Sequence, residues 1–149
     1  MRPKKVLLIV HRDDENLSQL CFLFHVHGYR TIPCADRELG LRNLDAGVNL
    51  VIADFKTAMM HGKKDAEFKT MAEEMKDRIP QVPILLIASK EDYEPGVLHC
   101  ADAMVTASCP VAELRERVFV MSARKKGPKK DFHPPHGFKK IETVSMGDS

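Results

Sequence analysis

The chain lacks any long hydrophobic run. None of its apolar stretches approaches the roughly 20 consecutive residues that a membrane-spanning helix requires. The first five residues, Met1 to Lys5, lead directly into a short apolar stretch without a signal-like cleavage site. We therefore expect a cytoplasmic protein with no membrane segment.

Closely spaced cysteines are also lacking. The four cysteines, Cys21, Cys34, Cys100 and Cys109, are scattered along the chain, whereas zinc and redox sites usually contain a close Cys pair. We interpret them as reduced side chains of the core or of loops, as is typical of a reducing compartment. This pattern argues against zinc or disulfide redox chemistry.

The net charge of the chain is small, and its charged residues are unevenly distributed along the sequence. The net charge of the 149 residues is +2, but residues 124–149 contain seven Lys or Arg against three Asp or Glu, and the remainder has 16 against 18. This C-terminal stretch also contains six Pro or Gly residues and is too polar to form a core. We predict a folded domain over residues 1–123 and a basic, disordered tail over residues 124–149.

Strand-like and helix-like patterns alternate along the first 123 residues. The expected strands are residues 4–10, 29–34, 50–54, 82–89 and 103–106, and the expected helices are residues 17–28, 36–46, 64–78, 94–101 and 111–123. This alternation predicts parallel strands with helices on both faces of the sheet. The fold class is therefore α/β, with a single doubly wound sheet of five parallel strands.

Asp54 stands at the carboxyl end of the most apolar expected strand. The four residues before it, Leu50 to Ala53, are all apolar, which is typical of a strand buried on both faces. In open α/β sheets, binding and chemistry take place at the carboxyl ends of the strands. Asp54 is therefore a candidate site residue, although it could equally be an Asp that only begins a loop.

Several short motifs occur together in an order that resembles a known family. Over roughly Lys4–Ala123 the chain is similar to the CheY-like receiver domains of bacterial two-component response regulators. The resemblance implies a flavodoxin-like (βα)5 fold with strand order 2-1-3-4-5. The motifs are the LLIV strand, Gly28-Tyr29, the LVIAD strand ending at Asp54, Met60-His61-Gly62, Val82-Pro83-Ile84, and Cys100-Ala101-Asp102 leading to Glu113-Leu114.

The resemblance assigns roles to positions around Asp54. Asp54 occupies the phospho-acceptor position of the family, and Lys56 occupies the position whose backbone carbonyl binds the metal ion. In the family, a fixed number of residues separates the metal-binding acidic pair from the Gly-Tyr that follows the first helix. Counted back from Gly28, that interval places the pair at His11 and Arg12, which cannot serve as carboxylate ligands. In an alternative alignment, a two-residue loop insertion allows Asp13 and Asp14 to bind Mg²⁺ together with Asp54.

Three further family positions also depart from the pattern. The switch hydroxyl falls at Ala88, the switch aromatic at Met104, and the lysine that contacts the phosphoryl group at Ala107. A shift of two residues would place Cys109 at the lysine position, so no lysine is supplied by either alignment. These positions predict a degenerate receiver, or pseudo-receiver, that needs no metal or other cofactor.

In place of an exchangeable Mg²⁺ ion, we expect a fixed positive charge from a side chain of the protein. Arg12 can hold a carboxylate by two hydrogen bonds. We therefore hypothesise an ion pair between Arg12 and Asp54, joined by Lys56, that replaces Mg²⁺ and holds the pocket in one state.

The leading interpretation of function is a non-enzymatic module that acts in signal transduction through protein–protein contacts. The expected partner is a signalling protein, such as a histidine kinase or its effector, or a second copy bound through the surface of Glu94–Ala123. The alternative is a working phospho-receiver that accepts a phosphoryl group from a histidine kinase on Asp54. A third interpretation is nucleic-acid binding by the basic tail, although such charge runs usually only solvate a terminus.

Overall fold

The computed structural model describes residues 3–60 and 69–123. Its ten elements follow the predicted alternation, with one very short additional helix after β3. In chain order they are β1 (Val6–Val10), α1 (Asp14–Val26), β2 (Arg30–Cys34), α2 (Arg37–Asn43), β3 (Leu50–Asp54), α3 (Phe55–Ala58), α4 (Met71–Arg78), β4 (Ile84–Ala88), β5 (Ala103–Thr106) and α5 (Val111–Ser122). The basic tail and the predicted motif residues His61 and Gly62 lie outside the described residues.

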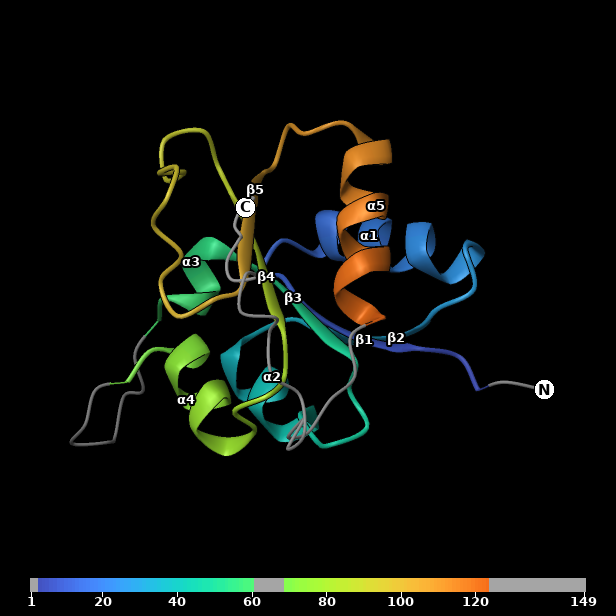
Figure 1. Ribbon diagram of the computed structural model, residues 1–149, viewed down its shortest axis with the longest axis horizontal. Coiled ribbons are helices and arrows are strands. Elements are labelled where there is room, and N and C mark those ends of the chain that lie inside the picture. Colours follow the sequence, from blue (N-terminus) through green and yellow to red (C-terminus); the bar gives the residue numbers. More distant parts are fainter. Residues whose placement is uncertain (1–2, 61–68, 124–149) are drawn as a thin grey trace, which may run out of the picture.

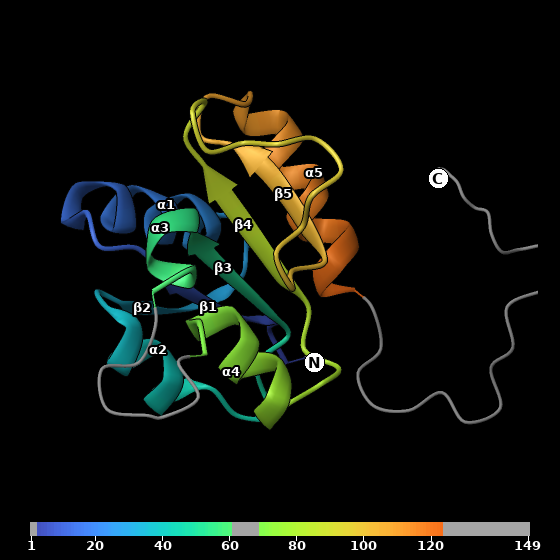
Figure 2. The same cartoon turned by 90° about the vertical axis from the view of Figure 1, so that its left-hand side faces the viewer.

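The five strands form one parallel sheet in the order β2-β1-β3-β4-β5, as predicted. Helices α1 and α5 cover one face, and α2 and α4 cover the other (Figures 1 and 2). Alternation along the strands separates two cores: Leu7 and Ile9 pack toward α1 and α5, whereas Leu8 and Val10 pack toward α2 and α4. All five residues of β3 are buried, which explains its continuous apolar sequence.

Helix α1 begins three residues before the predicted start at residue 17 and ends two residues before the predicted end at residue 28. The side chain of Asp13 accepts a hydrogen bond from the backbone N–H of Asn16, and Asp13 is therefore the N-cap. Gly28 follows the helix with a φ of 95°, a conformation that glycine adopts without strain. His27, which we expected on the apolar stripe, is instead exposed, and its ring bonds the carbonyl of Leu23.

The predicted helix over residues 64–78 is shorter in its described part. Lys69 and Thr70 are not helical, and α4 begins at Met71 because Thr70 and Glu73 form a reciprocal capping box. Helix α2 is also shorter than residues 36–46: Asp36 is its N-cap and Leu44 has an extended backbone. The late start of α4 therefore follows from its capping box, and the early end of α2 follows from the extended backbone at Leu44.

The helix expected over residues 94–101 is absent from the described structure. The segment between β4 and β5 consists of turns, with Gly96 at a φ of 87° and His99 and Cys100 at φ values of 48° and 69°. Left-handed residues cannot continue a right-handed helix, and they account for the error in the prediction. Of the helices that the structure does describe, none is long and apolar enough to cross a membrane.

An ion pair at the amino ends of the strands ties α4 to the sheet. Lys76 Nζ donates to Asp102 Oδ2 at 2.7 Å and to the carbonyl of Val82 at 2.7 Å. The same carboxylate oxygen accepts from the backbone N–H of Ile84 at 2.8 Å. Asp102 therefore joins β4, β5 and α4 at one point.

We expect the substitution Asp102→Ala to lower the free energy of unfolding by about 1–3 kcal/mol, because it leaves the half-buried ammonium group of Lys76 and the N–H of Ile84 without their acceptor. Urea denaturation followed by circular dichroism measures this change. The exposed Glu91→Ala is the matched control and should change stability by less than about 0.5 kcal/mol. Equal effects of the two substitutions would contradict the proposed role of Asp102.

Candidate functional site

Asp54 is the last residue of β3 and lies at the carboxyl edge of the sheet, between β1 and β4. Its register partner on β4 is Ile87, and its exposed fraction is 8%. The preceding residues of β3 are fully buried, so the backbone of this strand holds the carboxylate in a fixed place. Asp54 therefore lies at the carboxyl end of the third strand, as the sequence predicts.

The two carboxylate oxygens of Asp54 have different surroundings. Oδ2 accepts a hydrogen bond of 3.3 Å from the backbone N–H of Thr57, which makes Asp54 the N-cap of α3. Oδ1 is buried and has no hydrogen-bond partner in the structure. A buried carboxylate oxygen without a partner is costly, and it marks Oδ1 as the atom available for a ligand.

His11 and Arg12 follow β1, but neither contacts Asp54 through a recorded bond. The Nδ1 atom of His11 accepts a hydrogen bond of 3.1 Å from the backbone N–H of Asp13, and the side chain of Arg12 is exposed. Among the ion pairs within residues 3–60 and 69–123, none joins Arg12 to Asp54. The ion pair hypothesised from the sequence is therefore not formed.

The alternative ligands Asp13 and Asp14 lie at the start of α1 and are both exposed. One oxygen of Asp13 is already used as the helix cap. Across the described part of the chain, no three His, Cys, Asp or Glu side chains come together as metal ligands would. The structure therefore does not assemble Asp13, Asp14 and Asp54 into one group.

The residues around Asp54 do not match the ligand preferences of Mg²⁺. This ion is bound through oxygen atoms, usually of carboxylates, phosphates and water. Asp54 Oδ1 is a suitable ligand, but the aligned acidic-pair positions carry the imidazole of His11 and the guanidinium of Arg12. A single carboxylate without acidic partners at these positions is a poor site for a divalent cation.

Lys56 is held by a carboxylate other than Asp54. Its Nζ lies 3.0 Å from Asp92 Oδ2, in the segment that follows β4. Asp92 also accepts a hydrogen bond of 3.2 Å from the hydroxyl of Ser89, whose oxygen accepts from the backbone N–H of Asp92 at 3.3 Å. Lys56, Asp92 and Ser89 thus connect α3 to the segment after β4. The expectation that Lys56 would join Asp54 is wrong.

The pKa of Asp92 is lowered below its usual range. The main cause is the hydrogen bond from Lys56, and the hydrogen bond from Ser89 and the charge of Lys56 act in the same direction. Because the folded-state pKa is lower than the unfolded one, this pair contributes stability above the pKa of an unfolded Asp, about 3.9. That contribution is lost as the pH falls through the lower folded-state value.

The three remaining family positions lie on β4 and β5 or directly after them. Ala88 is fully buried at the end of β4, and Met104 packs in the same core, opposite Leu86. Ala107 is exposed directly after β5, where its N–H donates to the carbonyl of Ala88 at 2.8 Å. Each position lies where the sequence predicted, and each carries an apolar side chain.

The segment between β4 and β5 contributes a residue that sequence reasoning missed. The ring of His99 packs edge-on against Phe55, the residue after Asp54, with centroids 5.1 Å apart. His99 Nε2 is buried without a hydrogen-bond partner. Asp92 was missed as well, although its spacing of three residues from Ser89 after a strand is a common turn pattern.

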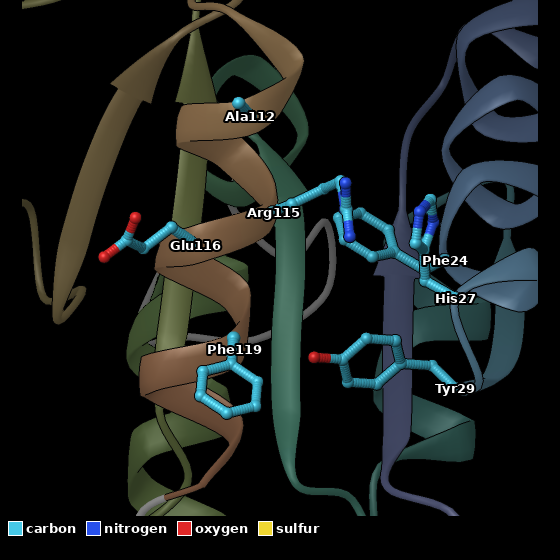
Figure 3. A pocket seen from close by; sticks show the side chains of 7 residues that line it. All are labelled: Phe24, His27, Tyr29, Ala112, Arg115, Glu116 and Phe119. Atoms are coloured by element: carbon cyan, nitrogen blue, oxygen red, sulfur yellow. The ribbon is translucent and has the colours of Figure 1, made fainter.

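A separate cleft lies between α1 and α5, away from Asp54. Its volume is about 420 Å³, and its lining includes Phe24, Tyr29, Arg115 and Phe119. Arg115 reaches from α5 toward Phe24 and His27 (Figure 3). Tyr29 directly precedes β2, so this cleft faces the amino ends of the strands and shares no residue with the candidate site.

No family model and no curated protein matches the sequence. Solved structures match the fold. A response regulator receiver domain from Clostridium thermocellum superposes with a TM-score of 0.67 at 16% identity, covering 79% of this chain and 94% of that one. TrrA from Thermotoga maritima, solved with Mg²⁺ and beryllofluoride, gives 0.63 at 21% identity, covering 78% and 98%. The non-phosphorylated HemR receiver domain from Leptospira biflexa gives 0.66 at 14%, covering 84% and 99%.

The chain has the receiver fold. The strand order and the covering helices agree with the fold of these similar structures. A turn-rich segment, in place of the helix that we expected between β4 and β5, is a feature of this chain.

We expect Lys56→Met to raise the pKa of Asp92 toward its ordinary value, because the main hydrogen bond to the carboxylate is lost. A carbon-detected NMR titration of the side-chain carboxyl groups measures it. Lys90→Met is the matched control, since Lys90 is an exposed neighbour outside the pair. An unchanged pKa in Lys56→Met, or the same rise in both variants, would contradict the assigned ion pair.

Proposed function

We propose that this chain is a receiver-fold signalling module that acts by protein–protein contact, without Mg²⁺-dependent phosphorylation of Asp54. The observation that carries the proposal is the charge around that residue. Asp54 supplies a carboxylate, whereas His11 and Arg12 occupy the positions of the acidic pair. Under this proposal the module is not an enzyme and requires no cofactor.

Phosphoryl transfer depends on charge compensation and positioning. The incoming phosphoryl group and the accepting carboxylate are both negative, so a bound cation and fixed donors must stabilise the transition state. Ala107 offers no ammonium group at the position where the resemblance implies a lysine, and the ammonium group of Lys56 is engaged by Asp92. These contacts support a module that has lost the reaction.

The two side chains that would couple Asp54 to the binding surface are also replaced. In the family resembled, a hydroxyl and an aromatic side chain couple the site to the binding face, and here those positions are Ala88 and Met104. Both side chains are buried in one apolar core, where they have no polar partner to exchange. A partner would therefore recognise one constant shape.

The region Glu94–Ala123 is the proposed partner surface. It includes the turn-rich segment before β5 and the outer face of α5, where Val111, Phe119 and Val120 are exposed by 56%, 67% and 52%. Exposed apolar side chains grouped on one helix are typical of interaction sites. The proposed partner is a signalling protein, such as a histidine kinase or an effector, or a second copy of the chain.

One observation favours the second candidate function, a working phospho-receiver. Asp54 Oδ1 is free of protein partners, which leaves it available to accept a phosphoryl group from a histidine kinase. This function would need Asp13 or Asp14 to move toward Asp54 and bind Mg²⁺. Nucleic-acid binding through residues 124–149 concerns residues outside the described structure and stays a prediction.

Incubation of the chain with acetyl phosphate and Mg²⁺ distinguishes the two candidate functions. We expect intact-mass spectrometry to show no added phosphoryl group, because the charge needed for transfer is missing. Asp54→Asn is the matched control for any modification that does occur. Stoichiometric modification of the wild-type chain that disappears in Asp54→Asn would contradict the proposal and establish the second function.

A restoring variant makes a negative result informative. The triple substitution His11→Asp, Arg12→Asp and Ala107→Lys reintroduces the acidic pair and the ammonium group. We expect it to gain Mg²⁺-dependent modification of Asp54, provided that circular dichroism shows a native fold. Wild-type modification equal to that of the triple variant would mean that these three positions do not limit the reaction.

Self-association tests the surface. We expect sedimentation velocity to show a concentration-dependent dimer that Phe119→Asp weakens by at least about tenfold, since truncating a central apolar contact usually costs more than 1 kcal/mol. Phe22→Asp on α1 is the control, because Phe22 is exposed by 69% and lies outside Glu94–Ala123. A dimer that is lost only in Phe22→Asp would place the interface on α1 instead.

A further inference from the structure

A cavity of about 330 Å³ opens between α1, α5 and the carboxyl ends of β4 and β5. This volume lies within the usual range of small-molecule sites, roughly 300–1,000 Å³. Asp54 is not among the residues that line it, but His11 and Ala107 are, so the cavity shares two of the aligned family positions without including Asp54 itself. It nevertheless lies at the edge of the sheet where open α/β folds bind their ligands.

The inner wall of the cavity is apolar and incompletely covered. Ile87 lies on β4, an interior strand paired with β3 and β5, yet it is only half-buried, whereas Leu86 and Ala88 beside it are fully buried. The wall is completed by Leu20, Leu23, Val105 and Leu114. A bound apolar group would cover surface that the two helices leave open, which is favourable in water.

The rim of the cavity is polar but carries no formal charge when His11 is neutral. It includes His11, Asn16, Gln19 and Thr106, and the lining has no Asp, Glu, Lys or Arg. The Nδ1 atom of His11 accepts from the N–H of Asp13, so the neutral ring carries its proton on Nε2. The side-chain amides of Asn16 and Gln19 have no recorded protein partner within the described ranges, and they can therefore donate or accept.

We propose that this cavity binds a small neutral molecule with an apolar body and one hydrogen-bonding group. The apolar wall would hold the body, and the amides, hydroxyl and imidazole of the rim would bond the polar end. Ala107 belongs to the lining, and a lysine there would place an ammonium group at the opening. An uncharged lining disfavours carboxylates, phosphates and ammonium ions, because it offers no charge to replace their hydration.

Three probes of nearly the same shape test the charge preference: benzamide is neutral, benzoate is an anion and benzamidinium is a cation. We expect benzamide to shift the amide NMR signals of residues that line the cavity, with saturation near a Kd of about 1 mM. The other two probes should bind at least about tenfold more weakly. Equal binding of all three probes, or no saturable binding of benzamide, would overturn the proposal.

Two substitutions reduce the cavity. Ile87→Phe adds volume at its wall, and Ala107→Phe adds volume at an exposed position of its opening, where the fold is not at risk. We expect both to weaken benzamide binding at least about tenfold. Val26→Phe is the matched control, because Val26 is exposed on α1, outside Glu94–Ala123, and does not line the cavity. Should Ile87→Phe fail to fold by circular dichroism, Ala107→Phe alone decides the result.

Cys109 provides an independent readout. It lines the cavity, and burial raises the pKa of its thiol. We expect saturating benzamide to slow its reaction with N-ethylmaleimide several-fold and to leave that of the exposed Cys100 unchanged. Protection of neither cysteine, or of both equally, would overturn the proposal.

The position of the NMR shifts identifies other occupants. Benzamide shifts confined to the cleft of Phe24 and Arg115 would assign binding to the wrong cavity and overturn the proposal. Shifts of Asn16, Gln19 and Leu20, which line the cavity outside Glu94–Ala123, on concentrating the protein alone would identify a second copy as the occupant and overturn the proposal. Acetyl phosphate modification of Asp54 affects neither conclusion, so failure of the proposed function is distinguished from failure of this one.

Discussion

The structure is organised by the complete burial of β3, which carries a carboxylate to the open edge of the sheet. Five consecutive buried residues leave this strand no freedom to move, so Asp54 is fixed at the position where neighbouring loops meet. The two carboxylate oxygens of Asp54 differ in their hydrogen bonds. Oδ2 accepts one from the backbone N–H of Thr57, whereas Oδ1 has no hydrogen-bond partner among the described residues. A buried charge of this kind requires compensation, and the surrounding side chains determine what form the compensation takes.

Under the proposed function, those side chains form a site that binds no exchangeable metal ion. Arg12 is exposed beyond β1, and Lys56 points its charge to Asp92 instead of Asp54. The pair between Lys56 and Asp92 joins α3 to the segment after β4. The apolar Ala88 and Met104 fit the same account, because neither can exchange a hydrogen bond when a phosphoryl group arrives.

Much of this architecture could be predicted because it depends on local patterns. The apolar runs gave all five strands, Asp13 and Gly28 marked the ends of α1, and the alternation of elements implied a parallel sheet. The contacts of Lys56 could not be predicted, since several carboxylates lie within reach of a long flexible side chain and only the fold selects Asp92. The turn-rich segment before β5 was missed because apolar spacing from Glu94 to Ala101 resembles a helix, whereas Gly96, His99 and Cys100 adopt left-handed conformations.

A crystal structure of this chain grown with Mg²⁺ and beryllofluoride tests the central claim most directly, since Thermotoga maritima TrrA has been solved with the same ligands. The account predicts that Asp54 Oδ1 carries no beryllofluoride, that no Mg²⁺ lies beside it, and that Lys56 remains paired with Asp92. Beryllofluoride on Asp54, with Mg²⁺ bound by Asp13 or Asp14, would contradict it.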